Sequence, residues 1–233
     1  MTKPVCVVVG VGPGNGASIS RRYAASGYAV ALLARSAAFA EGVARELEDA
    51  RFYACDVTSE SDVERAFARL REELGDPEVL VYNAGSGVWG DVEGITPAAF
   101  ESAWRVNALG ALLTARQVIP SMKRRGHGAI VLIGATASRR GVARTAAFAP
   151  AKAAQRSLAE SMARHLWPAG IHVALVVVDG VVDLDQTRKA MPGKPDSFFV
   201  KPDDVAATVL WLSEQPRSAW AFEVEARPFG ETW

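Results

Sequence analysis

The fold is decided by a stretch near the N-terminus, Val5-Cys6-Val7-Val8-Val9-Gly10-Val11-Gly12-Pro13-Gly14-Asn15-Gly16. Its uninterrupted apolar run predicts a strand that is buried on both faces, as in a parallel sheet. The glycines that follow let the chain turn sharply, and a helix is expected from about 17 to 26, ended by Gly27. This order favours a dinucleotide-binding loop, because the free N–H groups and dipole of the helix attract a pyrophosphate.

The rest of the chain continues the alternation of short strands and longer helices. Further strands are expected at 29–34, 52–55, 79–82, 129–133, 171–178 and 220–226. Further helices are expected after the cap Thr58-Ser59-Glu60-Ser61, over about 97–124 and 147–166, and from Lys201 onward. No repeat, low-complexity segment or linker interrupts residues 1–233. The pattern predicts the α/β class: a single dinucleotide-binding domain with a Rossmann-type doubly wound parallel sheet.

The composition limits the classes of binding partner and the cellular compartment that we expect. The 26 basic residues balance the 26 acidic ones, so no overall field favours nucleic acid or an anionic membrane. Cys6 and Cys55 lie in apolar runs and suit a reducing compartment, and His127, His165 and His172 are too scattered to predict a metal site. The apolar runs are too short to span a membrane, and the first strand begins too early to leave room for a signal peptide. We expect a cytoplasmic protein.

Three further motifs complete a pattern. Asn83-Ala84-Gly85 follows the fourth strand, Asn107 lies in the first long helix, and Phe148-Ala149-Pro150-Ala151-Lys152 opens the second. With the spacing Gly10-x-x-x-Gly14-x-Gly16, these motifs resemble the short-chain dehydrogenase/reductase family over nearly the whole chain. The resemblance implies an oxidoreductase that binds a nicotinamide cofactor and a small-molecule substrate.

The end of the second strand predicts which nicotinamide cofactor is bound. NAD enzymes usually carry an acid there, whereas this chain reads Leu32-Leu33-Ala34-Arg35-Ser36. Arg35 can pair bidentately with a 2′-phosphate, with Ser36 as a second donor, so we expect NADP(H). The alternative is that Arg35 is an ordinary solvated loop charge. The resemblance implies further cofactor contacts from Gly10, Gly14, Asn15, Gly16, Asp56, Val57, Asn83, Ala84, Gly85, Lys152, Gly180 and Val182.

The reaction centre departs from the family pattern. In the family a Ser, a Tyr and a Lys act together while an Asn holds a water relay, and the Lys lowers the tyrosine pKa from about 10. Here Lys152 and Asn107 match the family, but Phe148 stands at the tyrosine position and Ala135 at the serine position. The serine and the tyrosine, which would touch a substrate carbonyl oxygen, are both replaced. The lysine and the asparagine, which act from behind these two groups, both remain.

Two nearby hydroxyls are candidates to replace them. Thr136 follows Ala135 directly, and Ser138 is a second choice. Neither is acidic enough to replace a phenol, but either could orient a water held by Lys152 and Asn107; the alternative is an ordinary loop hydroxyl. Asp179 replaces the proline of the family's Pro-Gly pair, where its carboxylate could act as an acid or base or simply cap the loop.

Three functions are compatible with this altered centre. The first is an NADP(H)-dependent oxidoreductase with an unusual proton path, for which an activated alkene or imine is a better substrate than a ketone. The second is an NADP(H)-binding protein without turnover, acting as a sensor or partner subunit. The third is a non-redox isomerase, lyase or cyclase that uses the apolar floor around Phe148.

The remaining segments suggest a lid and an interface. Residues 183–201 occupy the place of the family's substrate lid and are short, which predicts a small or open pocket. The resemblance implies a homodimer or homotetramer through the two long helices, 97–124 and 147–166. The tail carries Phe229 and Trp233, which we expect to dock on a neighbouring subunit or over the protein's own pocket, unless the terminus frays.

Overall fold

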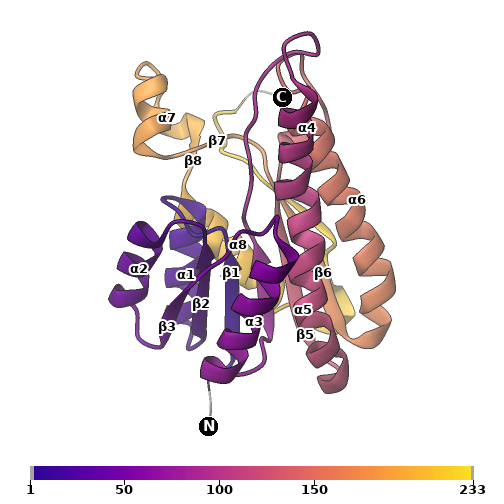
Figure 1. The fold of residues 1–233 in the computed structure, drawn as a ribbon. Helices are drawn as coiled ribbons and strands as arrows, with labels where there is room; N and C mark the ends of the chain where they lie inside the picture. Colours follow the sequence, from indigo (N-terminus) through magenta and orange to yellow (C-terminus); the bar gives the residue numbers. More distant parts are fainter. Residues whose placement is uncertain (1–2, 232–233) are drawn as a thin grey trace.

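A seven-stranded parallel sheet forms the centre of the molecule (Figure 1). The computed structural model describes residues 3–231. The sheet has the order β3-β2-β1-β4-β5-β6-β9, so the direction of winding reverses between β1 and β4. This order confirms the predicted doubly wound sheet. The strands are β1 (Val5–Val9), β2 (Ala29–Ala34), β3 (Ala50–Ala54), β4 (Val79–Tyr82), β5 (Gly128–Ala135), β6 (Ile171–Val178) and β9 (Glu223–Ala226).

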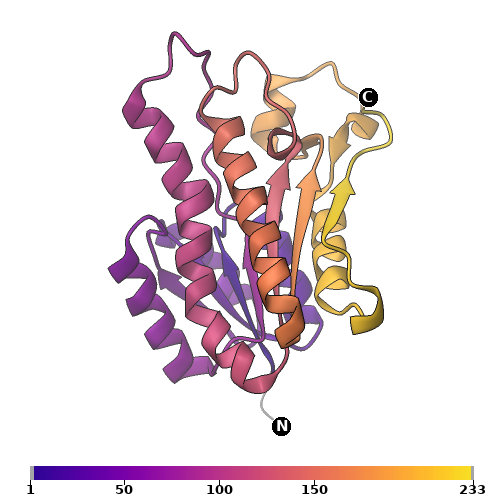
Figure 2. The ribbon, with the colours of Figure 1, turned by 90° about the vertical axis from the view of Figure 1, so that its right-hand side faces the viewer.

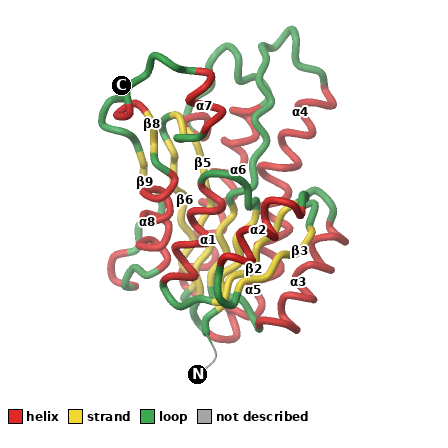
Figure 3. Tube along the Cα trace, turned by 90° about the vertical axis from the view of Figure 1, so that its left-hand side faces the viewer, coloured by secondary structure: helices red, strands yellow, loops and turns green. Residues whose placement is uncertain are grey.

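Helices cover both faces of the sheet (Figures 2 and 3). One face carries α1 (Asn15–Ala25), α2 (Ala37–Glu46) and α8 (Pro202–Ser213). The other carries α3 (Glu60–Leu74), α4 (Pro97–Trp104), a π-helical turn (Arg105–Leu109), α5 (Gly110–Arg125) and α6 (Phe148–Leu166). Strand residues alternate between the faces, so each face has its own apolar core; Leu80 and Leu132 belong to one, and Val81 and Val131 to the other.

Most expected elements are present, with shifts of a few residues at their ends. The strand expected at 52–55 is Ala50–Ala54, and the last strand is shorter than expected, Glu223–Ala226. Helix α2 was not predicted; only Ala40 and Val43 of its residues are buried. The helix expected over 97–124 is interrupted by the π-helical turn. The helix propensities of its residues do not predict this turn.

A small substructure stands above the carboxyl ends of the strands (Figure 1). It comprises β7 (Val181–Val182), α7 (Asp185–Ala190) and β8 (Phe199–Val200), and so includes most of the segment expected as a lid. The Arg188 guanidinium links its parts through ion pairs with Asp183 and Asp196, each with a nitrogen–oxygen distance of 2.6 Å. The Phe229 side chain of the tail is 93% exposed, whereas Trp233 lies outside the described residues. Within residues 3–231, no helix combines the length and the apolar character that crossing a membrane requires.

Helix α5 begins very close to the sheet. Gly110, its first residue, is buried, and a Cβ built there would lie 2.3 Å from Tyr82 Oη and 2.9 Å from Val57 Cβ. The Tyr82 hydroxyl donates to Val106 O at 2.5 Å, so the strand end and the π-helical turn are locked together at this point. Gly110 therefore sets how near the following turn, with Asn107, lies to the carboxyl edge of the sheet.

We expect Gly110→Ala to destabilise the protein by about 2 kcal/mol, because overpacking outweighs the gain of about 1 kcal/mol in helix propensity. Gly42→Ala in α2 is the matched control: nothing lies within 4 Å of its added Cβ, so it should stabilise by about 0.5 kcal/mol. Urea unfolding of both variants measures the difference. Equal stabilisation by the two substitutions would show that α5 has room to move away from β4.

Candidate active site

A cavity of about 590 Å³ lies at the carboxyl edge of the sheet, where the winding reverses. Ligands of doubly wound sheets bind at this kind of crevice. Most residues expected to touch a cofactor line it: Gly10, Asn15, Gly16, Arg35, Ser36, Asp56, Val57, Asn83, Ala84, Gly85 and Val182. Sequence reasoning did not single out the lining residues Leu33, Phe39, Cys55, Val106 and Leu184. Gly14, Gly180 and Lys152 are not in the cavity lining.

The glycine loop is fastened to the end of β4. Gly10 has φ +89°, and a Cβ there would lie 2.5 Å from the Ala84 backbone, so only glycine allows this approach. Asn83 Nδ2 donates to Gly10 O at 2.7 Å, and the Gly10 N–H donates to Leu33 O at 2.8 Å. These contacts join the ends of β1, β2 and β4. They give Asn83 a structural role beside its place in the cavity wall.

Opposite charges meet at the β2–β3 end of the cavity. Arg35 is exposed at the rim. Asp56 accepts from the Thr58 N–H at 2.9 Å and from its hydroxyl at 2.8 Å. The Thr58 N–H is the main cause that lowers the pKa of the Asp56 carboxyl, and the charge of Arg35 lowers it further. An ionised carboxylate and an exposed guanidinium thus flank this end of the cavity.

Leu184 covers part of the glycine loop. A Cβ on Gly14, which has φ +98°, would come within 2.5 Å of Leu184 Cδ2. This contact explains why Gly14 does not line the cavity while Leu184 does. The segment after β6 therefore reaches over the glycine loop at one side of the cavity. No sequence signal marked Leu184, because the contact joins segments about 170 residues apart.

Lys152 lies inside the protein, on the first turns of α6. Its Nζ donates to Ile133 O at 2.8 Å and to Gln155 Oε1 at 3.2 Å. Burial lowers the pKa of Lys152 to about 8. Lysine follows Phe148 by four residues, so both side chains are on one face of α6.

Asn107 sits in the π-helical turn. The Gly110 N–H bonds to Arg105 O, five residues back, which is the π-type pattern. Asn107 is fully buried, and its Nδ2 donates to Ala103 O at 2.8 Å and to Ser86 O at 3.2 Å. Its Oδ1 has no hydrogen-bond partner within residues 3–231. The turn thus aims a buried amide oxygen at the loop that follows β4.

Phe148 and Trp89 form an apolar contact at the start of α6. The Phe148 ring is half-buried, with its centroid 5.4 Å from that of Trp89 and the planes tilted by 39°. Trp89 is 60% exposed, on the loop after β4. That loop is tied to the chain before α6, since Gly90 N donates to Arg144 O at 2.9 Å. Ala135 carries no polar side-chain group.

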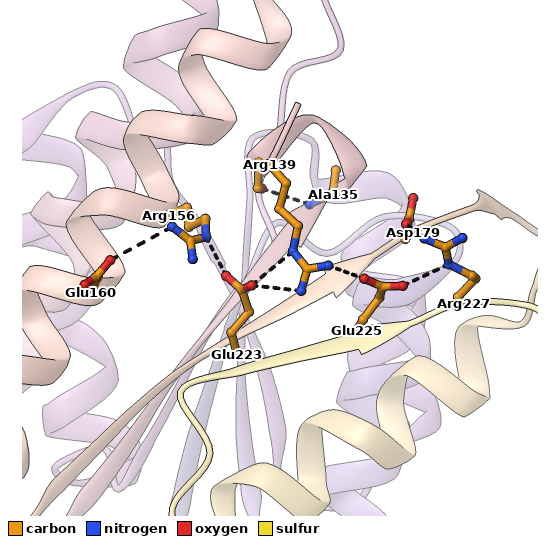
Figure 4. A network of polar contacts seen from close by, with 9 residues as sticks. Ala135, Arg139, Arg156, Glu160, Asp179, Glu223, Glu225 and Arg227 are labelled. Atoms are coloured by element: carbon orange, nitrogen blue, oxygen red, sulfur yellow. Dashed lines mark hydrogen bonds and ion pairs between the residues drawn. The ribbon is translucent and has the colours of Figure 1, made fainter. Parts of the chain in front are cut away.

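The hydroxyl of Thr136 is turned toward the end of β6. It donates to Asp179. Asp179 in turn forms an ion pair with Arg227 (Figure 4). Ser138 is buried, and its Oγ accepts the Ala135 N–H at 3.1 Å. Asp179 thus holds two partners inside the structure. A direct role of Thr136 in catalysis stays a prediction and would require this hydrogen bond to break.

Asp179 ends a chain of alternating charges that runs across β9 to α6 (Figure 4). Arg227 also pairs with Glu225 at 2.9 Å, and Glu225 pairs with Arg139. Arg139 continues to Glu223 at 2.8 Å. The network then passes through Arg156 to Glu160. The side chains of Asp179 and Arg227 are only 9% and 11% exposed, so the last pair is shielded from water.

Known proteins share both the sequence pattern and the architecture. Residues 4–194 match the family model described as short chain dehydrogenase. This chain belongs to the short-chain dehydrogenase family. The 3-oxoacyl-[acyl-carrier-protein] reductase MabA of Mycobacterium tuberculosis is 32% identical over 220 residues, 91% of this chain and 86% of that protein.

Two solved structures extend the comparison. An alcohol dehydrogenase from the archaeon Thermococcus sibiricus, complexed with 5-hydroxy-NADP, has a TM-score of 0.88 and 28% identity, covering 99% of this chain and 98% of its own. A metagenomic short-chain oxidoreductase in complex with NADP has a TM-score of 0.85 and 29% identity, covering 99% of both chains. The family relation assigns this short-chain dehydrogenase to a group of oxidoreductases.

We expect Arg227→Met to destabilise the protein by about 3 kcal/mol, because it leaves the shielded Asp179 carboxylate without its cation. Arg164→Met is the control: Arg164 is 78% exposed, its pair with Glu160 spans 2.7 Å, and its loss should cost about 0.5 kcal/mol. Thermal and urea unfolding measure both variants. Similar small losses would mean that solvent screens the Asp179–Arg227 pair.

Proposed function

We propose that this chain is an NADP(H)-dependent oxidoreductase whose proton path differs from the family pattern. The observation that carries the proposal is the cavity at the sheet reversal, which brings the glycine loop, Arg35 and Gly85 into one wall. Two solved relatives are complexes with NADP or 5-hydroxy-NADP. The cavity volume of about 590 Å³ and its length from Arg35 to Val182 suit a dinucleotide.

The residues present fit the cofactor at each end. Gly10 and Gly16 allow the backbone to approach a pyrophosphate beside the N-terminus of α1. Asn15 carries a buried Oδ1 without a partner within residues 3–231, which suits a ligand hydroxyl or N–H. Arg35 and Ser36 would hold the 2′-phosphate, and Lys152 the nicotinamide ribose. When bound, the cofactor supplies the hydride.

The protein's own contribution at the reactive end is binding and proton supply. Trp89 and Phe148 offer an apolar surface for the substrate, and Lys152 and Asn107 hold a proton relay behind it. A site without the phenol and the serine stabilises a developing oxyanion poorly. It is therefore better matched to an activated alkene or imine than to a simple ketone. Thr136 would orient a water as an auxiliary group once its hydrogen bond to Asp179 is broken.

Turnover separates this proposal from its alternatives. Steady-state assays with NADPH and three probes, ethyl acetoacetate, 2-cyclohexen-1-one and 2-methyl-1-pyrroline, should show oxidation of NADPH with at least one. Tight NADPH binding without turnover of any probe would favour a sensor or partner subunit. Conversion of a substrate without cofactor would favour an isomerase, lyase or cyclase.

We expect Arg35→Ala to weaken NADPH binding roughly tenfold to a hundredfold, because a guanidinium–phosphate hydrogen bond is worth about 1.5–3 kcal/mol. Binding of NADH, which lacks the phosphate, should stay unchanged. Arg45→Ala, a change at another exposed arginine in α2, is the control. Isothermal titration measures the affinities of NADPH and NADH for the wild-type protein and for both variants. A loss that is equal for NADPH and NADH would contradict a 2′-phosphate contact at Arg35.

We also propose a homodimer or homotetramer through the long helices. Phe100, Trp104 and Leu112 recur every fourth or eighth residue along α4–α5 and are 43%, 43% and 38% exposed. Helix α6 lies beside them, as Figure 2 shows. Such a row of large apolar side chains on neighbouring helices suits burial against a second copy.

The double variant Phe100→Asp with Trp104→Asp should lower the oligomer mass, because two carboxylates cannot be buried unpaired in an interface. Light scattering after size-exclusion chromatography reads the mass directly. Val92→Asp, at an 83% exposed loop residue, should leave it unchanged. A mass that stays constant in the double variant would place the interface on another surface.

A further inference from the structure

Trp89 is an exposed tryptophan on a loop that is anchored on both sides of it. Its side chain is 60% exposed, although the residues before and after it are partly buried. Gly90 N donates to Arg144 O at 2.9 Å, and Ala146 N donates to Gly90 O at 3.1 Å. Val88 packs against a small apolar cluster between α4 and α6. The loop is therefore held in place while the indole itself stays open to solvent.

The indole is connected to the cavity by two routes. Along the loop, a Cβ built on Gly87 would lie 3.1 Å from Trp89 Nε1, and Gly85, two residues earlier, lines the cavity. Along α6, Phe148 lies one helical turn before Lys152, whose Nζ would be 3.7 Å from a Cβ on Gly85. The Trp89 and Phe148 ring centroids are 5.4 Å apart. The two rings thus form an aromatic surface beside the Gly85 part of the cavity.

The charged side chains on the two ring-bearing segments offset one another. Asp91 and Glu93 lie on the loop after β4, Arg140 and Arg144 lie on the segment before α6, and all four are exposed. Arg139, on the same segment, is already paired with two glutamates of β9. A cation bound at the rings would therefore meet equal numbers of opposite charges, and the ring faces would attract it.

The Lys152 ammonium is the charge that would oppose such a cation. Its Nζ donates to Ile133 O at 2.8 Å and to Gln155 Oε1 at 3.2 Å, so two acceptors offset part of its charge. Burial also lowers the pKa of Lys152 to about 8, which leaves a fraction of it neutral near that pH. The repulsion is therefore weaker than that of an unbonded ammonium.

The side chains around the rings suit a substrate that needs no acid. Hydride addition to a C=O bond leaves an anionic oxygen, which requires a proton donor. Phe148 and Ala135 have no exchangeable side-chain proton, and the Thr136 hydroxyl is bonded to Asp179. An iminium, a C=N bond that already carries a positive charge, becomes a neutral amine when it accepts hydride. Of the two substrate classes proposed above, the C=N class in its charged form fits these residues best.

We propose that the substrate is a planar, cyclic iminium cation that binds on the aromatic surface of Trp89 and Phe148. The proposal rests on the proposed function, which supplies NADPH as the reductant. The iminium carbon accepts hydride from NADPH, and the electron pair of the C=N π bond moves to nitrogen. The substrate is reduced to a neutral amine, NADPH is oxidised to NADP⁺, and no proton leaves the protein. The amine product loses the cation–π attraction and is released from the rings.

A permanently charged iminium tests the binding surface without turnover. With NADP⁺ bound no hydride is available, so isothermal titration measures the affinity of 2-methyl-3,4-dihydroisoquinolinium itself. We expect Trp89→Leu to weaken this affinity roughly threefold to thirtyfold, and Trp89→Phe to restore part of it, because a ring face is needed. The affinity of 1-tetralone, a neutral ketone of similar size, should change much less.

Trp211→Leu is the matched control. Trp211 is 54% exposed on α8 and does not line the cavity. This variant should leave the affinities of the iminium and of the ketone unchanged.

Steady-state turnover with NADPH tests the substrate class. After subtraction of the rate without protein, Trp89→Leu should raise KM for 2-methyl-3,4-dihydroisoquinolinium in the same proportion as its dissociation constant, with kcat nearly constant. Phe148→Tyr should raise kcat/KM for 1-tetralone without raising it for the iminium, because only the ketone requires the proton of a phenol. A general loss of folding would lower both activities together.

The outcomes separate this proposal from the proposed function. Iminium affinity that is unchanged in Trp89→Leu, or that falls no more than ketone affinity, would overturn the cation site. Turnover of 1-tetralone or 2-cyclohexen-1-one without turnover of the iminium would overturn the substrate class, while an NADPH-dependent oxidoreductase stands. Absence of NADPH oxidation with every probe would overturn the proposed function, and the titrations with NADP⁺ would still decide whether the rings bind a cation.

Discussion

The approach of Gly10 to the Ala84 backbone is the contact on which the site depends. β1 and β4 are neighbours at the point where the sheet changes its direction of winding, so the loops that follow them diverge to opposite faces. The absent side chain at Gly10 and the hydrogen bond from Asn83 Nδ2 to Gly10 O hold these loops together at their base. The cavity opens directly above this junction. Any side chain at Gly10 would push the glycine loop away from Gly85 and separate the two halves of the site.

The start of α6 combines an exposed apolar contact with a buried ammonium. Phe148 and Trp89 form the front, on segments that the Gly90–Arg144 hydrogen bond joins. Behind it, the Lys152 ammonium is held by one carbonyl and one amide oxygen rather than by a carboxylate. Neutral acceptors stabilise the charge less than an anion does, and for this reason burial prevails and lowers the pKa of Lys152.

At the end of β6 the shielded charge is an anion, and a cation neutralises it. Asp179 brings a carboxylate to a place that is shielded from water, and Arg227 neutralises it from beyond β9. The pair couples the last strand of the sheet to the segment that leads into the lid, and through Glu225 and Arg139 it reaches the turn after β5. The buried carboxylate of Asp179 is therefore neutralised by a residue about fifty positions away, a relation that only the folded chain reveals.

Much of the fold follows from local rules that operate along the sequence. Continuous apolar runs such as Val5–Val9 have to be buried on both faces, and the glycine loop has to follow the first of them, so the doubly wound sheet and the place of its crevice were predictable. The four-residue step from Phe148 to Lys152 likewise fixed a common helix face. The site residues themselves remain predictions, although the cavity brings most of them together.

The tertiary structure decided every feature that depends on contact between distant segments. Helix α2 is held by only two buried side chains, so little of it contributes to the core. The π-helical turn that aims Asn107 forms where the helix is locked to Tyr82 at Val106 O. Leu184 over Gly14, Thr136 on Asp179 and the place of Gly85 before Lys152 follow from packing across the sheet. Residue type and spacing determine local conformation. The hydrogen-bond partner of each polar group is set only when the chain folds, because a polar group needs a partner once it is buried.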